Sequence, residues 1–142
     1  MKKVYKILLL SIAISIICLN CSEECDDCLE LTTKNIKYIN SNGTNLLFGN
    51  QATYNPDSII IKVGNDNDIG VWKQEDIGTI MFNLEESYTT YYIVLSDSLI
   101  DTLDFELAQR KSTSCCGNVT YSTKTLLNGL EIENNDLVVI TH

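Results

Sequence analysis

Short apolar segments separated by turn-forming residues recur along this 142-residue chain from Ile36 onward. Many of the segments are rich in β-branched and aromatic residues, which favour strands. No segment carries an i, i+3, i+4, i+7 apolar stripe long enough for an amphipathic helix. Short strands with turns between them are typical of sandwiches and small barrels. We therefore expect an all-β fold, a single small antiparallel β-sandwich of immunoglobulin-like or similar architecture.

The turns locate the expected strands. Asn42-Gly43 and Asn128-Gly129 both predict tight hairpins, because Asn and Gly accept positive φ. Residues 64–70 form an expected polar loop. Strands are expected at residues 36–39, 45–48, 58–63, 71–73, 78–84, 89–95, 101–109, 119–123 and 137–140.

The N-terminal segment predicts export from the cytoplasm. It begins with the basic residues Lys2, Lys3 and Lys6, and residues 7–19 then form an uncharged run of apolar and small residues. That run suits a signal peptide and is too short to span a bilayer. We expect a signal peptide over residues 1–20, an acidic tether over 21–34 and the all-β domain over 35–142.

Cys21 stands where the apolar run gives way to Ser22-Glu23-Glu24. This arrangement resembles a bacterial lipoprotein signal, in which the cysteine thiol is lipidated and the cysteine becomes the mature N-terminus. The Ser-Glu-Glu that follows resembles the export tag of surface-exposed lipoproteins of the Bacteroidota. Cys115-Cys116-Gly117 is similar to the Cys-Cys-Gly of many small lipoproteins from these bacteria, a likeness that brings no known activity.

The resemblance implies that an N-terminal lipid such as palmitate holds the protein at the outer membrane, exposed at the cell surface. Cys18 is the alternative lipidated residue, and Asn20 suits the small position before the cysteine better than Ile17 does. An ordinary secretory signal cut near Asn20 and an uncleaved anchor are further alternatives.

Four more cysteines predict disulfide bonding, since the protein is expected in an oxidising compartment. We expect at least one bridge from Cys25 or Cys28 to Cys115 or Cys116. A zinc site or a redox pair would suit the spacing of Cys25 and Cys28. Against zinc, the distal two cysteines are adjacent; against a redox pair, no strand precedes the first two.

Without residues 1–20 the chain carries seven basic and 19 acidic residues, a net charge of −12. An acidic surface without a basic patch excludes nucleic acid and anionic lipid headgroups as expected partners. An envelope protein or a glycan remains as the expected partner, and no cofactor is expected.

The only histidine is His142, the last residue given. A terminal side chain is usually disordered, so we expect no placed base for a serine or cysteine nucleophile and no histidine metal site. The expected function is a non-enzymatic binding or structural module. The alternatives are an accessory subunit of an outer-membrane complex and a glycan-directed hydrolase using Glu85 with Glu86, or Asp101 with Asp104.

Trp72, Tyr91 and Tyr92 are the candidate ligand contacts. Adjacent residues of a strand face opposite ways, so Tyr91 or Tyr92 must leave the core. Asp66 and Asp68 suggest calcium, but Ile77 stands where a calcium loop has glutamate. A polar turn is the simpler interpretation, and we expect no metal.

Overall fold

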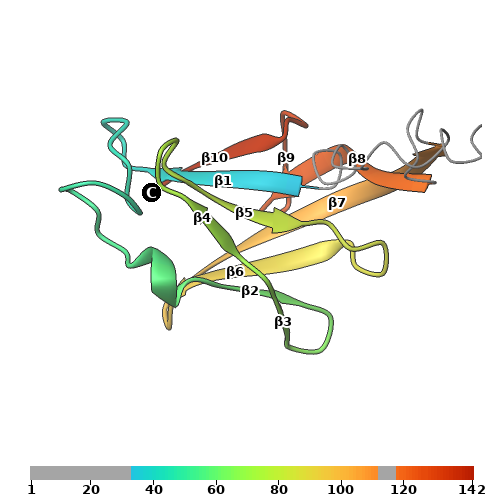
Figure 1. Cartoon of the computed structure of the whole chain (residues 1–142), viewed down its shortest axis with the longest axis horizontal. Coiled ribbons are helices and arrows are strands. Elements are labelled where there is room, and N and C mark those ends of the chain that lie inside the picture. The colour runs from blue at the N-terminus through green and yellow to red at the C-terminus, as the bar shows by residue number, and fades with distance from the viewer. Residues whose placement is uncertain (1–32, 112–117) are drawn as a thin grey trace, which may run out of the picture.

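The computed structural model describes residues 33–111 and 118–142, which form two packed β-sheets (Figure 1). The strands are β1 (Thr33–Ile39), β2 (Ile60–Val63), β3 (Asn67–Ile69), β4 (Trp72–Gln74), β5 (Thr79–Asn83), β6 (Thr90–Ser96), β7 (Leu99–Lys111), β8 (Asn118–Leu127), β9 (Leu130–Ile132) and β10 (Leu137–Thr141). Within these residues one sheet has the order β10-β1-β5-β4 and the other β3-β2-β6-β7-β8-β9. The expected all-β sandwich is confirmed.

Among the described strands, two of the four connections between the sheets, β3 to β4 and β9 to β10, join edge strands, and the other two, β1 to β2 and β5 to β6, join interior strands. β3 and β4 follow one another in sequence but belong to different sheets, so the chain changes sheets at Gly70-Val71 (Figure 1). At the other side β9 ends one sheet and β10 the other. β1 and β10 run parallel, whereas the other strand pairs in the described residues are antiparallel.

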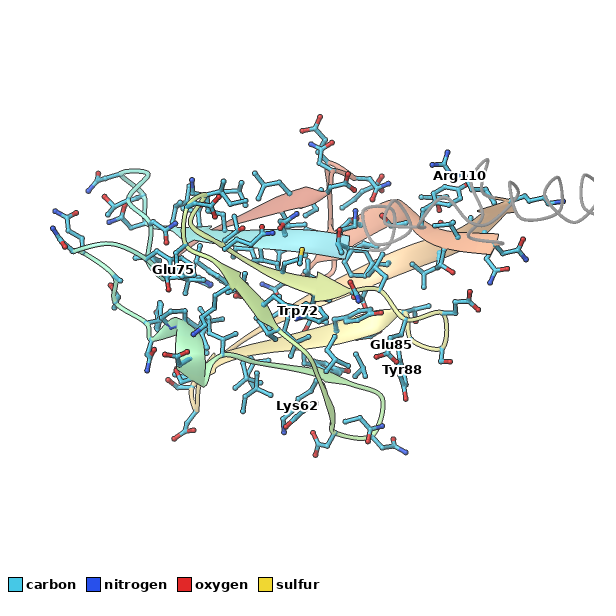
Figure 2. The ribbon with its side chains drawn as sticks, in the orientation of Figure 1. Lys62, Trp72, Glu75, Glu85, Tyr88 and Arg110 are labelled. Carbon is cyan, nitrogen blue, oxygen red and sulfur yellow. The ribbon has the colours of Figure 1, made fainter. Side chains whose placement is uncertain are left out.

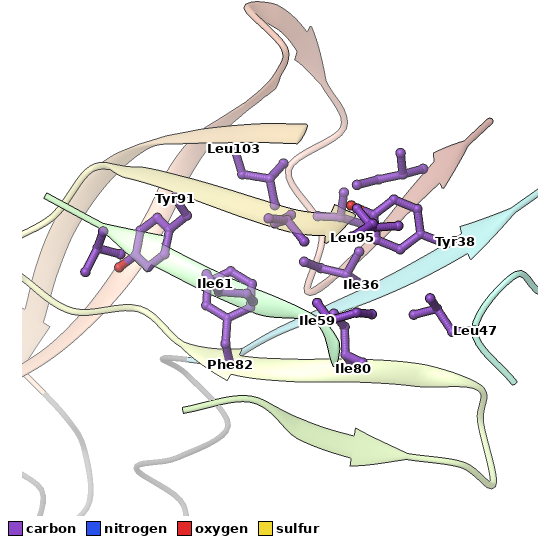
Figure 3. Packing of buried hydrophobic residues seen from close by; sticks show 14 of the residues in the cluster. Ile36, Tyr38, Leu47, Ile59, Ile61, Ile80, Phe82, Tyr91, Leu95 and Leu103 are labelled. Carbon is purple, nitrogen blue, oxygen red and sulfur yellow. The ribbon is translucent and has the colours of Figure 1, made fainter. Parts of the chain in front are cut away.

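Alternate residues of the facing strands form the core (Figure 3). Three aromatic rings pack together within it. The centroid of Tyr91 lies 5.1 Å from that of Phe82 and 5.5 Å from that of Phe105. The fully buried large side chains are Ile36, Tyr38, Leu47, Ile61, Val63, Ile80, Phe82, Tyr91, Ile93, Leu103, Val138 and Ile140.

Two expectations about local structure are wrong. Residues 45–48 form a loop instead of a strand: Asn45 makes one isolated bridge to Ile39, and its side chain then bonds both to nearby amides and to the distant Gly78. Its Oδ1 accepts hydrogen bonds from the amides of Leu47 and Phe48, and its Nδ2 donates to the carbonyl of Gly78 at 2.7 Å. The polar loop expected at 64–70 contains β3, which pairs with β2.

The N-terminal part of the chain was expected to carry the anchor. The expected signal peptide, the expected lipidated cysteine and the disulfide candidates lie outside the described residues: residues 1–20, Cys21, Cys25, Cys28, Cys115 and Cys116. β1 begins at Thr33, within the segment assigned to the tether. Over residues 33–111 and 118–142, no helix has the length and apolar character needed to cross a membrane.

Candidate binding surfaces

Tyr91 and Tyr92 point to opposite sides of β6, as the strand period requires. Tyr91 is fully buried, and its hydroxyl accepts a hydrogen bond of 2.7 Å from the amide of Glu85. Burial raises the pKa of Tyr91 to about 12. Tyr92 is 40% exposed on the outer face of the six-stranded sheet. Tyr91 is therefore a core residue, and Tyr92 is the one available for contact.

An apolar groove lies beside Tyr92 on this outer face. Ile60 of β2 is in register with Val94 of β6, which is in register with Ile100 of β7. Ile60 is 39% exposed and Ile100 54% exposed. Together with Tyr92 these side chains line a groove of about 480 Å³. We call the surface formed by Ile60, Tyr92, Val94 and Ile100 the outer-face groove.

Polar side chains border the outer-face groove. Lys62 lies next to Tyr92 in register, and its ammonium is 3.3 Å from the carboxylate of Asp66. Ser96 and Asp97 close the groove at the β6–β7 turn. An apolar centre with a polar rim is the usual anatomy of a protein–protein contact surface.

Sequence reasoning did not identify Ile60, Val94 or Ile100 as contact residues. The signal was present at β2, where Ile59, Ile60 and Ile61 form an unbroken apolar run. Because alternate residues of a strand face opposite sides, such a run makes both faces of the strand apolar. Ile59 and Ile61 fill the core, which leaves Ile60 on the outside.

Trp72 is also exposed, at 47%, but it lies on the other sheet (Figure 2). It pairs with Met81, whose neighbours Ile80 and Phe82 point into the core. Trp72 therefore faces outward from the four-stranded sheet. Trp72 and Tyr92 do not form one aromatic surface.

A buried carboxylate cluster at one end of the sandwich was not expected. Asp101 is 2% exposed, and its Oδ2 accepts a hydrogen bond of 3.0 Å from the hydroxyl of Tyr38. Asn128 Nδ2 donates to Asp101 Oδ1 at 2.8 Å, and His142 Nε2 lies 2.8 Å from Oδ2. Burial, and next the charge of Asp101, raise the pKa of Tyr38.

The expectation that the His142 side chain is disordered is wrong. Its ring stacks on Tyr38 with a centroid distance of 5.7 Å and an interplanar angle of 10°. Its backbone amide also donates to the carbonyl of Ile39. The imidazole thus lies on a buried carboxylate, and these three side chains join the two sheets.

The carboxylates considered for hydrolysis do not come together as an acid–base pair at β7. Asp101 points into the sandwich, whereas Asp104 points away from it and accepts a hydrogen bond of 2.6 Å from Thr90. Glu85 and Glu86 are exposed in the β5–β6 connection, where Glu86 accepts from Thr120.

A small polar pocket of about 190 Å³ lies between Lys34 and Arg110. Lys34 is 3% exposed, and its ammonium donates to the carbonyl of Asn135 at 2.8 Å. Burial lowers the pKa of Lys34, and the nearby Asp136 carboxylate opposes this shift. The guanidinium of Arg110 lies over the ring of Tyr121. Lys34 belonged to the expected tether, so this pocket was also missed.

The calcium candidates lie on the β2–β3 hairpin. Asp66 adopts a positive φ of 66° in the turn and is paired with Lys62, while Asp68 lies in β3. In the described part of the chain, no group of three His, Cys, Asp or Glu residues is arranged to hold a metal ion. The turn conformation alone accounts for an Asn- and Asp-rich sequence here.

Comparison of the chain with models of protein families, with curated proteins and with solved structures finds no match.

Proposed function

We propose that this protein is a lipid-anchored binding module of the cell envelope, which holds a partner protein in the outer-face groove without catalysing a reaction. The observation that carries the proposal is the row of exposed apolar side chains on β2, β6 and β7. Exposed apolar surface costs solubility, so a contiguous patch with a polar rim marks an interaction site.

The chemistry of the groove favours a protein over a glycan. Three of its four apolar side chains, Ile60, Val94 and Ile100, are aliphatic and branched. These suit the apolar side chains of another protein, and Tyr92 supplies the kind of aromatic anchor that often dominates such interfaces. Glycan binding would instead draw on several aromatic rings in one plane, and Trp72 lies on the other sheet.

The anchor is the second part of the proposal. The basic start, the apolar run and Cys21 support lipidation at that cysteine. More than one acyl chain is needed for stable attachment to a membrane. In the native host, a fatty-acid analogue is expected to label the protein, and Cys21→Ser is expected to abolish the label. If the label persists in this variant, the lipidated residue is Cys18 and not Cys21.

The groove is tested by site-specific photo-crosslinking in the native host. A photoreactive residue replaces Ile100 in the full-length chain, and the control carries it in place of Leu130. Leu130 is 73% exposed on β9 of the same sheet and lies outside the groove. We expect a discrete protein adduct from position 100 and none from position 130. Identical adduct patterns at the two positions would overturn the proposal, as would adducts with glycan alone.

A further inference from the structure

β10 is built unlike the other three strands that end the two sheets. β3, β4 and β9 have three residues each, and each carries a charge at its centre: Asp68, Lys73 and Glu131. Short length and charge are the usual protection of an edge strand against pairing with another chain. β10 (Leu137–Thr141) has five residues and no charge. Among the described residues nothing protects this edge.

The main-chain groups on the free side of β10 can be assigned from its bonds to β1. The carbonyl of Asp136 accepts from the amide of Asn35, and the amide of His142 donates to the carbonyl of Ile39. In a parallel ladder, alternate residues bond to the same neighbour. The even-numbered residues of β10 therefore face β1.

The amides and carbonyls of Leu137, Val139 and Thr141 consequently point to the free edge. In the described part of the chain β10 pairs with β1 alone. The side chains of Leu137 and Val139 are 44% and 46% exposed. A groove of about 520 Å³, lined in part by Ile132, Val138 and Val139, runs beside this edge. The edge offers both unpaired main-chain groups and apolar contact area.

We propose that β10 pairs with β10 of a second copy of this chain, antiparallel, about a two-fold axis at Val139. Val139 is the middle one of the three free-edge residues. Only this register pairs all three, Val139 with itself and Leu137 with Thr141 in both directions. A two-fold contact of this kind closes on itself, as most homodimer contacts do. The two four-stranded sheets become one continuous sheet.

The charges next to β10 favour a second copy as the occupant. In this register Asp136, whose side chain is 82% exposed, stands opposite His142 of the second copy, so the two Asp136 side chains of the dimer do not face one another. The five paired positions between them carry no charge. The excess of acidic residues on the whole chain opposes association at long range. Added salt screens this repulsion and strengthens the dimer.

Variants of the full-length chain that each carry one cysteine added to the native six test the register, and peptide mapping separates the new bond from bonds of the native cysteines. Residues that face each other across antiparallel strands have Cα atoms about 5.5 Å apart, within disulfide reach. We expect Val139→Cys to form a covalent dimer under mild oxidation, with peptide mapping that shows a 139–139 bond. Leu137→Cys alone is not expected to form a disulfide dimer. When it is mixed with Thr141→Cys, we expect a 137–141 disulfide. Leu130→Cys, on exposed β9, is the control for random collision.

Each other outcome contradicts the proposal. If Val139→Cys forms a disulfide dimer no faster than Leu130→Cys does, β10 does not pair with a second copy. If Leu137→Cys forms a 137–137 disulfide, the strands pair in a different register. A bond from position 139 to another protein shows a different occupant. As a second measurement, Val139→Lys places like charges across the axis and is expected to lower the dimer fraction in sedimentation, with an unchanged circular dichroism spectrum.

Discussion

The hydroxyl of Tyr38 on β1 donates a 3.0 Å hydrogen bond to the carboxylate of Asp101 on β7 and so joins the two sheets inside the sandwich. Both residues are buried, which strengthens the bond and makes an unpaired carboxylate costly. The same oxygen of Asp101 is contacted by His142. The cluster therefore holds the end of β10 against the six-stranded sheet.

Tyr38→Phe removes one donor from Asp101 and keeps the ring in the core. We expect the free energy of unfolding to fall by about 1.5–3 kcal/mol, the usual range for a bond to a charged group. Urea unfolding measures the change. Tyr121→Phe is the control, because its ring contact with Arg110 is retained, and it is expected to stay within about 0.5 kcal/mol. Equal effects of the two variants would show that the Tyr38–Asp101 bond is not stabilising.

Asn128 has two separable roles in the β8–β9 hairpin. Its backbone adopts a positive φ of 51°, and its side chain bonds both Asp101 and the amide of Thr102. Asn128→Gly keeps the conformation and loses the bonds, at an expected cost of about 1–3 kcal/mol in unfolding free energy. Asn128→Ala adds the strain of positive φ, about 1 kcal/mol more. Thermal or urea unfolding in which the alanine variant is the more stable of the two would contradict this assignment.

Stability is expected to fall in alkali. Tyr38 and Tyr91 hold their protons more tightly when folded, and the pKa of Tyr91 is raised from 10.0 to about 12. Below pH 10 both tyrosines are protonated in the folded and the unfolded state, so they add no pH dependence to the stability there. As the pH rises from 10 towards 12, the unfolded chain loses these protons first, so the unfolding free energy decreases. Urea unfolding between pH 9 and 12 measures it, and Tyr38→Phe should show a shallower decrease.

Lys34→Met is expected to keep or raise stability, by up to about 1 kcal/mol. Burial lowers the pKa of Lys34, so its charged form is disfavoured in the folded state. Asp136 is 82% exposed and loses little when its partner is removed. Lys34 should also make the wild-type unfolding free energy rise as the pH increases towards 10.5, because the unfolded chain holds this proton more tightly than the folded protein does. This rise should be absent in Lys34→Met. Lys37→Met, on the outer side of β1, is the control. A loss above about 1 kcal/mol specific to Lys34→Met would contradict the prediction.

The β-sandwich could be predicted because the strand signals are local. The Asn128-Gly129 turn predicts the hairpin that β8 and β9 form. The alternation of Leu103 and Phe105 with polar residues predicts the half-buried strand β7. The expected strand at 45–48 was wrong because Asn45 bonds to Gly78, which is distant in sequence. The parallel pairing of β1 with β10 is likewise a contact between the two ends of the domain, which no local pattern encodes.

The candidate site was only partly predictable. The strand period predicts that Tyr91 and Tyr92 separate, and the structure shows which of them is outside. The partners of Tyr92 in the groove come from β2 and β7, so their meeting depends on strand order. His142 was misjudged because its place depends on Asp101 and Tyr38, which the sequence does not bring together.

The most direct test of binding through the outer-face groove uses the partner protein that the crosslinker at position 100 identifies. The measurement is the affinity of this partner for variants of the groove. Ile100→Asp puts a charge in the apolar centre, and Tyr92→Ala removes the aromatic anchor. Each is expected to weaken binding by about tenfold or more. Trp72→Ala, which removes an aromatic side chain of similar exposure from the other sheet, is expected to leave the affinity unchanged. Unaltered binding by Ile100→Asp and Tyr92→Ala, or a loss confined to Trp72→Ala, would contradict the proposed function.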